Sequence, residues 1–156
     1  MDEVTFRSPA DLVGEPDPVK RVRFADELAE ASKRLAGEFY RVRREAVAEL
    51  AAATTNAEAA RLLGVHRNKI GDAVKQVAAD DRELFDDALQ VLARDGASGA
   101  SSTELMRGLA VAELAPKARR VQFGVKHVVP SALSADELTL VGRAARRAAA
   151  VLDGRG

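Results

Sequence analysis

Residues 56–75 constrain the fold more than any other stretch, because their small and apolar side chains are spaced for two helices joined by a tight turn. Gly64 lies at the turn, where glycine readily adopts the positive φ that ends a helix. The small side chain of Ala60 lets the helices cross closely, so the second leaves the first at a steep angle. The residues expected to face each other across the pair, or to fill its corner, are Ala59, Ala60, Leu62, Leu63, Val65, Ile70, Ala73 and Val74.

The motif Ala59-Ala60, Leu63-Gly64-Val65 and Ile70 resembles the helix-turn-helix of bacterial transcription regulators. It is similar to the sigma-factor region-four-like type, which is common in small actinobacterial regulators. The resemblance implies a helix pair that binds double-stranded DNA, but it implies no particular target. His66 departs from the family pattern, since many members have a serine there that caps the second helix.

In docking of this type, the first residues of the second helix face the base edges. Arg67 suits guanine O6 and N7, and Asn68 suits adenine N6 and N7. Asp72 either accepts from a cytosine amino group or braces Arg67 or Lys75, while Gly71 leaves room for the groove edge. The residues expected to contact bases are therefore Arg67, Asn68, Gly71 and Asp72.

A second group of polar residues is better placed for phosphates, which set the register of the protein on the duplex and not the sequence it reads. The expected phosphate contacts are Thr55, Asn56, His66, Lys69 and Lys75. Arg41 and Arg44 precede the motif and are either a solvated face or further contacts to the DNA backbone.

The charge of the chain is balanced, with 24 basic and 24 acidic side chains. Residues 51–79 carry four basic and two acidic side chains, whereas residues 80–100 carry two basic and six acidic ones. Attraction to phosphates is therefore expected to be moderate and local. The few polar side chains of the motif must supply most of the affinity.

Residues 19–53 predict one long helix, because they lack proline and consist mainly of helix-forming residues. Steps of four and three residues place an apolar stripe along it, as in a heptad repeat. The stripe includes Leu28, Leu35, Phe39, Val42 and Ala46, with Ser32 interrupting it. Such a long helix is not stable by itself, so its apolar stripe must be buried against another helix. Either it packs on the C-terminal helices of its own chain, or it pairs with a second copy in a homodimer, and we expect the homodimer.

The C-terminal region is expected to be helical. The second motif helix is predicted to end near Ala79, with Asp80 and Asp81 as a break. Further helices are predicted over residues 82–94, 101–115, 116–129 and 134–153, with capping boxes at Ser101–Glu104 and Ser134–Glu137. A strand near residues 121–129 is the alternative to the third of these helices. A second helix-turn-helix across residues 103–129, with Arg119 and Arg120 on its reading helix, is a weaker alternative.

Several classes of function are not expected. The chain has no cysteine and two histidines, so we predict no metal site, no cofactor and no catalytic residue at His66 or His127. The acidic pairs Asp80-Asp81 and Asp86-Asp87 are interpreted as solvated faces and caps. No apolar run is long enough to span a membrane, and acidic residues follow Met1 where a signal peptide would be basic. A cytoplasmic, nucleoid-associated protein is expected.

These observations predict an all-α protein with four parts: a flexible acidic tail (1–18), a long dimerisation helix (19–53), a helix-turn-helix (54–79) and a C-terminal helical region (80–156). The predicted function is a sequence-specific, dimeric transcription regulator that binds double-stranded DNA, with a protein partner at the C-terminal helices as a further expectation. Two alternatives remain. One is an architectural, phage or plasmid protein that packages or segregates DNA. The other is a sigma-like adaptor that binds RNA polymerase through the acidic segment 80–87.

Overall fold

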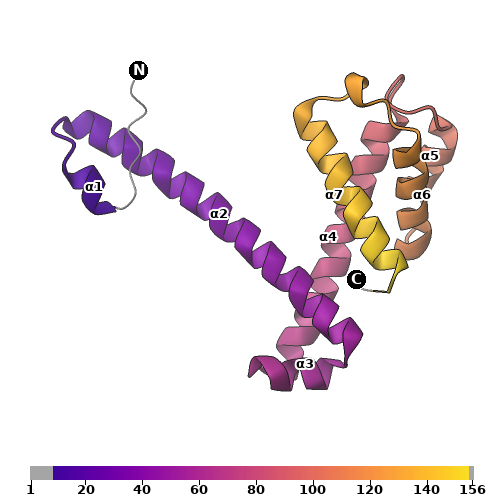
Figure 1. The fold of residues 1–156 in the computed structure, drawn as a ribbon, viewed down its shortest axis with the longest axis horizontal. Coiled ribbons are helices and arrows are strands. Elements are labelled where there is room, and N and C mark those ends of the chain that lie inside the picture. The colour runs from indigo at the N-terminus through magenta and orange to yellow at the C-terminus, as the bar shows by residue number, and fades with distance from the viewer. Residues whose placement is uncertain (1–8, 155–156) are drawn as a thin grey trace. The chain divides into compact units, whose positions relative to one another are not determined.

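The computed structural model describes residues 9–154, and within them the chain is helical without a strand, which confirms the all-α prediction. Figure 1 shows the order of the helices along the chain. They are α1 (Pro9–Val13), α2 (Pro18–Ala53), α3 (Asn56–Leu63), α4 (Arg67–Ala93), α5 (Ser102–Leu109), α6 (Leu114–Lys126), the 3-10 helix η1 (Pro130–Ala132) and α7 (Ala135–Leu152).

The chain divides into two compact units between Arg43 and Arg44, so the division falls within α2 and not at its end. The first unit contains α1 and most of α2. The predicted tail is therefore partly wrong, because residues 9–13 form a helix whose Leu12 is buried. Residues 1–8 of that tail lie outside the described residues. The second unit contains the last turns of α2 and all later helices.

A small apolar cluster holds the beginning of α4 against α3 and the end of α2. Its buried residues are Val47, Ala51, Ala59, Ala60, Ile70 and Ala73, and the half-buried Leu50, Val65 and Val74 pack on them. This arrangement confirms the inner face predicted for the helix pair, except at the end of α3. Leu62 and Leu63 remain 54% and 44% exposed, because alanines and the side chains of α2 and α4 already fill the cluster.

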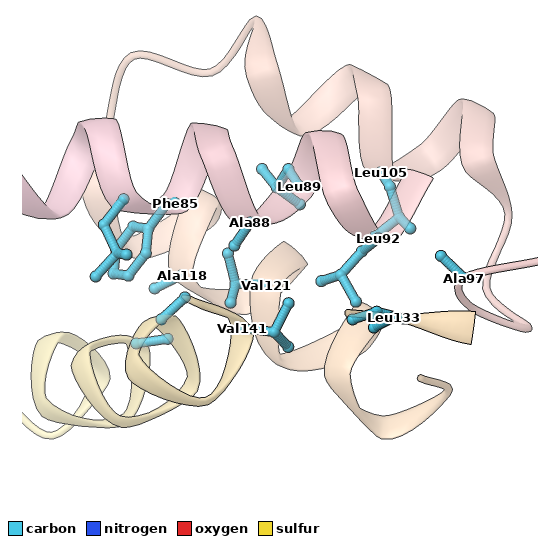
Figure 2. Packing of buried hydrophobic residues seen from close by; sticks show 13 residues of the cluster. Phe85, Ala88, Leu89, Leu92, Ala97, Leu105, Ala118, Val121, Leu133 and Val141 are labelled. Carbon is cyan, nitrogen blue, oxygen red and sulfur yellow. The ribbon is translucent and has the colours of Figure 1, made fainter. Parts of the chain in front are cut away.

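The larger core lies between the second half of α4 and the helices α5, α6 and α7. Figure 2 shows Phe85, Leu89 and Leu92 of α4 pointing into it beside Val121 of α6 and Val141 of α7. Phe85 and Leu89 are fully buried, as is Leu105 of α5. The apolar face predicted for residues 82–94 is thus the central surface of this core.

Two glycines allow the helices of the larger core to pack closely. A Cβ atom added at Gly124 of α6 would lie 2.9 Å from Leu92 Cδ1 and 3.0 Å from Leu105 Cδ2. A Cβ atom at Gly108 of α5 would lie 3.0 Å from Leu89 Cδ1. The backbones of α5 and α6 therefore approach their neighbours as closely as the absence of a side chain permits.

The predicted helix end near Ala79 is wrong, because α4 continues for 27 residues from the motif into the larger core. The two aspartates expected to break it lie in its middle and bond to other helices. Asp80 accepts from Arg44 of α2, and Asp81 accepts from Arg147 of α7. One continuous helix therefore belongs both to the motif and to the C-terminal bundle (Figure 1).

Other predicted boundaries also change. The helix expected over residues 101–115 ends early, at Leu109, and the helix expected from residue 116 begins at Leu114. Residues 121–126 are helical, as favoured, and the alternative strand is absent from the described part of the chain. Its only trace is an isolated antiparallel bridge between Ser98 and Val128. Among residues 9–154, no helix is long and apolar enough to cross a membrane.

Candidate nucleic-acid interface

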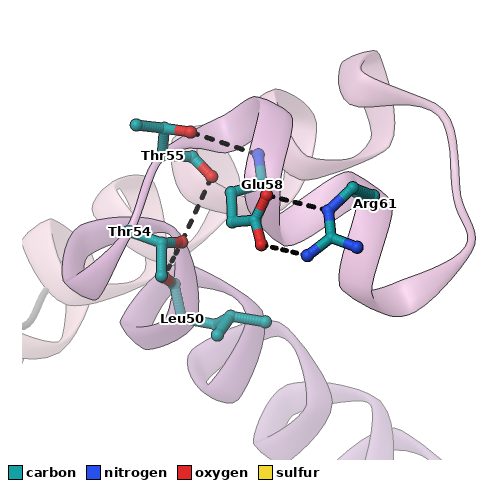
Figure 3. Close-up of polar contacts among 5 residues, drawn as sticks. All are labelled: Leu50, Thr54, Thr55, Glu58 and Arg61. Carbon is teal, nitrogen blue, oxygen red and sulfur yellow. Dashed lines mark hydrogen bonds and ion pairs between the residues drawn. The ribbon is translucent and has the colours of Figure 1, made fainter.

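The first motif helix begins at a side-chain cap. Thr55 has extended backbone angles, and its hydroxyl oxygen accepts the N–H of Glu58 at 3.1 Å (Figure 3). Threonine is a preferred residue at this position because it satisfies an N–H that has no partner inside the helix. The Thr55 hydroxyl hydrogen stays available, and the side chain is exposed. Thr55 can therefore cap α3 and donate to a phosphate at the same time.

The surface of α3 carries an ion pair between Glu58 and Arg61, in which the Arg61 Nε lies 2.9 Å from a Glu58 oxygen (Figure 3). The hydrogen bond from Arg61 lowers the pKa of Glu58 below its usual value. This pairing neutralises Arg61, which is one of the four basic side chains of the motif region.

The turn after α3 has the geometry predicted from Gly64. Its φ of 65° and ψ of 32° lie in the left-handed region, which glycine adopts without the steric cost of a Cβ atom. The N–H of Gly64 donates to the carbonyl of Arg61, and the N–H of Val65 donates to that of Ala60. These bonds close the end of α3. They set the start of α4 three residues after Gly64.

His66 caps the second motif helix, although the resemblance favours serine there. Its Nδ1 accepts the N–H of Asn68 at 3.2 Å, and its backbone is extended. The imidazole thus takes the place of the serine hydroxyl. The side chain is exposed at the start of α4, where free N–H groups favour an anion.

The residues expected to contact bases come together on one surface. An open hollow is lined by Asn56, Arg67, Asn68, Gly71, Asp72 and Lys75. Five of these six residues come from the first three turns of α4, and Asn56 comes from the start of α3. The hollow therefore contains all four expected base contacts and two of the expected phosphate contacts.

The charged groups of this surface are unpaired within the described residues. Arg67, Lys69, Asp72 and Lys75 are exposed, and none of them forms a salt bridge there. Three cations against one carboxylate leave the surface positive. Such groups can exchange water for phosphate or base contacts without first breaking a bond inside the protein.

Gly71 adds space to the hollow. Apart from the surrounding backbone of α4, no atom lies within 4 Å of the position that its Cβ atom would take, so no packing contact requires a glycine there. Glycine in a helix interior costs about 1 kcal/mol relative to alanine. An external partner that approaches the backbone closely would account for this residue.

The other residues expected to contact the DNA backbone differ in their surroundings. Lys69 is exposed beside the hollow without lining it. Arg44 is half-buried, and its Nη2 lies 3.4 Å from Asp80 Oδ2, so it already has a partner. Arg41 is also half-buried, and its Nε has no hydrogen-bond partner in the described part of the chain.

The interpretation of the acidic pairs as solvated is wrong for three of the four carboxylates. Asp81 is buried and receives Arg147 Nε at 2.8 Å and Nη2 at 2.9 Å. This bond, with the nearby Glu45 and Glu49, raises the pKa of Arg147 despite its partial burial. Asp80 accepts from Arg44 and Gln76, and Asp86 pairs with the buried Lys117. Sequence reasoning missed the ion pairs with Arg44, Lys117 and Arg147 because their members lie far apart in the chain.

The alternative reading helix, α6, offers fewer free cations at its beginning. Lys117 pairs with Asp86, and Arg120 pairs with Glu104 of α5. Arg119 is exposed and unpaired among the described residues. No group of three or more potential metal ligands is gathered in residues 9–154.

No family model, curated protein or solved structure matches this chain.

Proposed function

We propose that this protein is a sequence-specific DNA-binding transcription regulator that inserts the first turns of α4 into the major groove of double-stranded DNA. The observation that carries the proposal is the hollow lined by Arg67, Asn68, Gly71 and Asp72. A short helix, a glycine turn and an exposed second helix present these side chains as a helix-turn-helix does. The resemblance to sigma-factor region-four-like motifs agrees with this role.

The regulator would act as a homodimer through α2, with its two motifs reading half-sites about one helical turn apart. It would be found on the nucleoid. The apolar stripe supports the dimer, because Leu35, Phe39 and Val42 are each more than half exposed. The C-terminal helices would support the dimer or bind a protein partner.

The alternative of a sigma-like adaptor depends on the acidic segment 80–87, and the structure gives it less support. Asp80, Asp81 and Asp86 bond within the fold, which leaves fewer carboxylates of residues 80–87 free to bind a polymerase. The architectural alternative uses the same surface and differs in its lack of sequence preference.

Selection of bound sequences from random duplex DNA, combined with a salt titration, tests the proposal. Enrichment of a palindromic motif is the expected result. Binding without enrichment would favour the architectural protein, and no binding at low salt would overturn both and leave the adaptor.

The Arg67→Ala variant then tests the reading residue. It should lose about 1–3 kcal/mol of specific binding and relax the preference at one base pair, because a bidentate contact to guanine is removed. Arg119→Ala is the matched control, since Arg119 is also exposed and unpaired among the described residues but lies on α6. An unchanged preference in Arg67→Ala would show that Arg67 does not read a base.

A further inference from the structure

The exposed stripe of α2 has the pattern of a two-stranded coiled coil. With Leu28, Leu35 and Val42 at the d positions, the a positions are Ala25, Ser32 and Phe39. The four large side chains of this seam are 39%, 53%, 67% and 55% exposed for Leu28, Leu35, Phe39 and Val42. A seam of this length runs for about 30 Å at 1.5 Å per residue, and burying it stabilises an otherwise solvated helix.

The charges beside the seam favour one alignment of two copies. Glu38 occupies a g position and Arg43 the next e position, and neither has an ion-pair partner in the described residues. In a parallel coiled coil without offset, each g residue meets the e residue five positions later in the other chain. Glu38 then meets the partner's Arg43, and the symmetry of the dimer makes this contact twice.

Other alignments lose this complementarity. In an antiparallel pair, g residues face g residues and e residues face e residues, so Glu38 and Arg43 never meet. A parallel pair shifted by one heptad places Glu38 opposite Ala36 or Leu50. Ser32 favours the same arrangement, because at an a position in register it faces its own copy and the two hydroxyls can bond. In an antiparallel pair it would face a leucine or valine at a d position, where its hydroxyl would be buried without a partner.

We propose that residues 25–46 of α2 pair with the same residues of a second copy as a parallel, in-register coiled coil, which Glu38 and the partner's Arg43 align. Ala29, Ala31 and Ala36 occupy three of the four remaining flanking positions, where small side chains let the helices approach, and Glu45 occupies the fourth. The inference deepens the homodimer of the proposed function and is independent of DNA binding. A parallel dimer would place both motifs at the same end of the coiled coil.

Charge exchange tests the alignment by sedimentation equilibrium of the full chain at low salt. Glu38→Arg and Arg43→Glu should each weaken dimerisation about tenfold, because two attractive contacts become repulsive. The double variant E38R/R43E should regain the wild-type dissociation constant. A monomeric wild-type chain, or a double variant no tighter than the single ones, would overturn the proposal.

Disulfide trapping tests the register directly, because the chain has no cysteine of its own. Under mild oxidation, Ser32→Cys should cross-link two chains at least tenfold faster than Gly37→Cys, which lies on the opposite face of α2 with open space around it. Equal rates would exclude the in-register seam. A monomer that still enriches a DNA motif would overturn this inference and the homodimer, but not the reading of DNA by α4. A cross-linked dimer that binds no DNA would overturn DNA binding and leave this inference intact.

Discussion

At the scale of single residues, Gly71 and Gly124 are glycines inside helices with opposite surroundings. Gly71 has open space where a Cβ atom would be, and Gly124 has two buried leucines within 3.0 Å of that point. The Gly71→Ala variant should be more stable than the wild type by about 0.5–1 kcal/mol, because alanine restricts the unfolded chain and favours the helix. Urea denaturation measures this gain.

The same Gly71→Ala variant should bind its DNA site less tightly by about 1–3 kcal/mol, since the methyl group would crowd a partner that approaches the backbone. A gain in stability with unchanged DNA affinity would show that the groove does not come close to Gly71. Gly142→Ala on α7 is the control, because its nearest neighbour is the flexible end of Arg146 at 3.9 Å.

Gly124→Ala should have the opposite effect on stability. The added methyl group would collide with Leu92 and Leu105, which are 1% and 0% exposed and cannot swing into solvent. We expect a loss of about 1–3 kcal/mol in the free energy of unfolding, even though alanine is the better helix former. A variant as stable as the wild type would indicate that α6 does not pack as closely on α4 and α5 as described.

At the scale of helices, the end of α4 is tied to the beginning of α7 by Arg94 and Glu137. Arg94 bonds to the Glu137 carboxylate and to the carbonyl of Ala132. Glu137 also accepts the N–H of Ser134 in a complete capping box. The bond from Arg94, followed by that from the Ser134 backbone, lowers the pKa of Glu137 to about 2.

This lowered pKa predicts the pH dependence of stability. Because the pKa is lower in the folded state than in the unfolded one, the stabilisation is complete above about pH 4.5 and is lost as the pH falls toward 2. Glu137→Gln keeps an acceptor for the cap and removes the charge. The difference in melting temperature between wild type and variant should therefore be constant from pH 7 to 5 and shrink below 4.5. A difference that persists unchanged at pH 2.5 would contradict the role of the charge.

The buried pair of Asp81 and Arg147 joins the middle of α4 to α7. Asp81→Ala should lower the free energy of unfolding by about 3 kcal/mol, because it leaves a partly buried guanidinium without its main partner. Adding Arg147→Met should restore part of this loss, since the unpaired charge is then gone. The third measurement is the loss of stability in Arg147→Met alone. If the loss in the double variant equalled the sum of the losses in the two single variants, Asp81 and Arg147 would not be coupled.

Local signals in the sequence predicted the beginnings and turns of these helices well. Gly64 and Ser134 act where their spacing to neighbouring residues indicated, because caps and turns depend on residues within one turn of the chain. Ser101 caps α5 as expected, but the Glu104 side chain pairs with Arg120 and does not complete the predicted capping box. The helix break predicted at Asp80 and Asp81 was wrong because contacts with residues distant in the chain decide the structure there. Aspartates are poor helix formers in isolation, but Arg44 and Arg147 stabilise them from 36 and 66 residues away.

At the candidate site, too, the sequence predicted what depends on neighbouring residues and missed what depends on packing between helices. The spacing of α4 was enough to predict that Arg67, Asn68, Gly71 and Asp72 share a face, since residues three and four apart are neighbours on a helix. It did not predict that Asn56 would join them from α3, because that depends on how the two helices cross. The exposure of Leu62 and Leu63 was missed because only the packed cluster shows that its space is already filled.

At the scale of the whole molecule, a net charge of zero leaves no general attraction to DNA. The free cations of the interface are Arg67, Lys69 and Lys75, of which the two lysines are expected on phosphates. Two phosphate contacts per copy predict a slope of log K against log salt of about −2 for a monomer and about −4 for a dimer. Fluorescence anisotropy with a selected duplex at several salt concentrations measures this slope.

Lys69→Gln should reduce the magnitude of the slope by about 1 per copy, and therefore by about 2 in a dimer, because one counterion fewer is released. Arg119→Gln should leave it unchanged, since Arg119 lies on α6 and outside the proposed interface. The opposite pattern, with a smaller slope in Arg119→Gln alone, would move the DNA contact to α5 and α6. A steep slope that neither variant changes would mean that phosphates are held elsewhere, and that the hollow on α4 is not the surface that binds DNA.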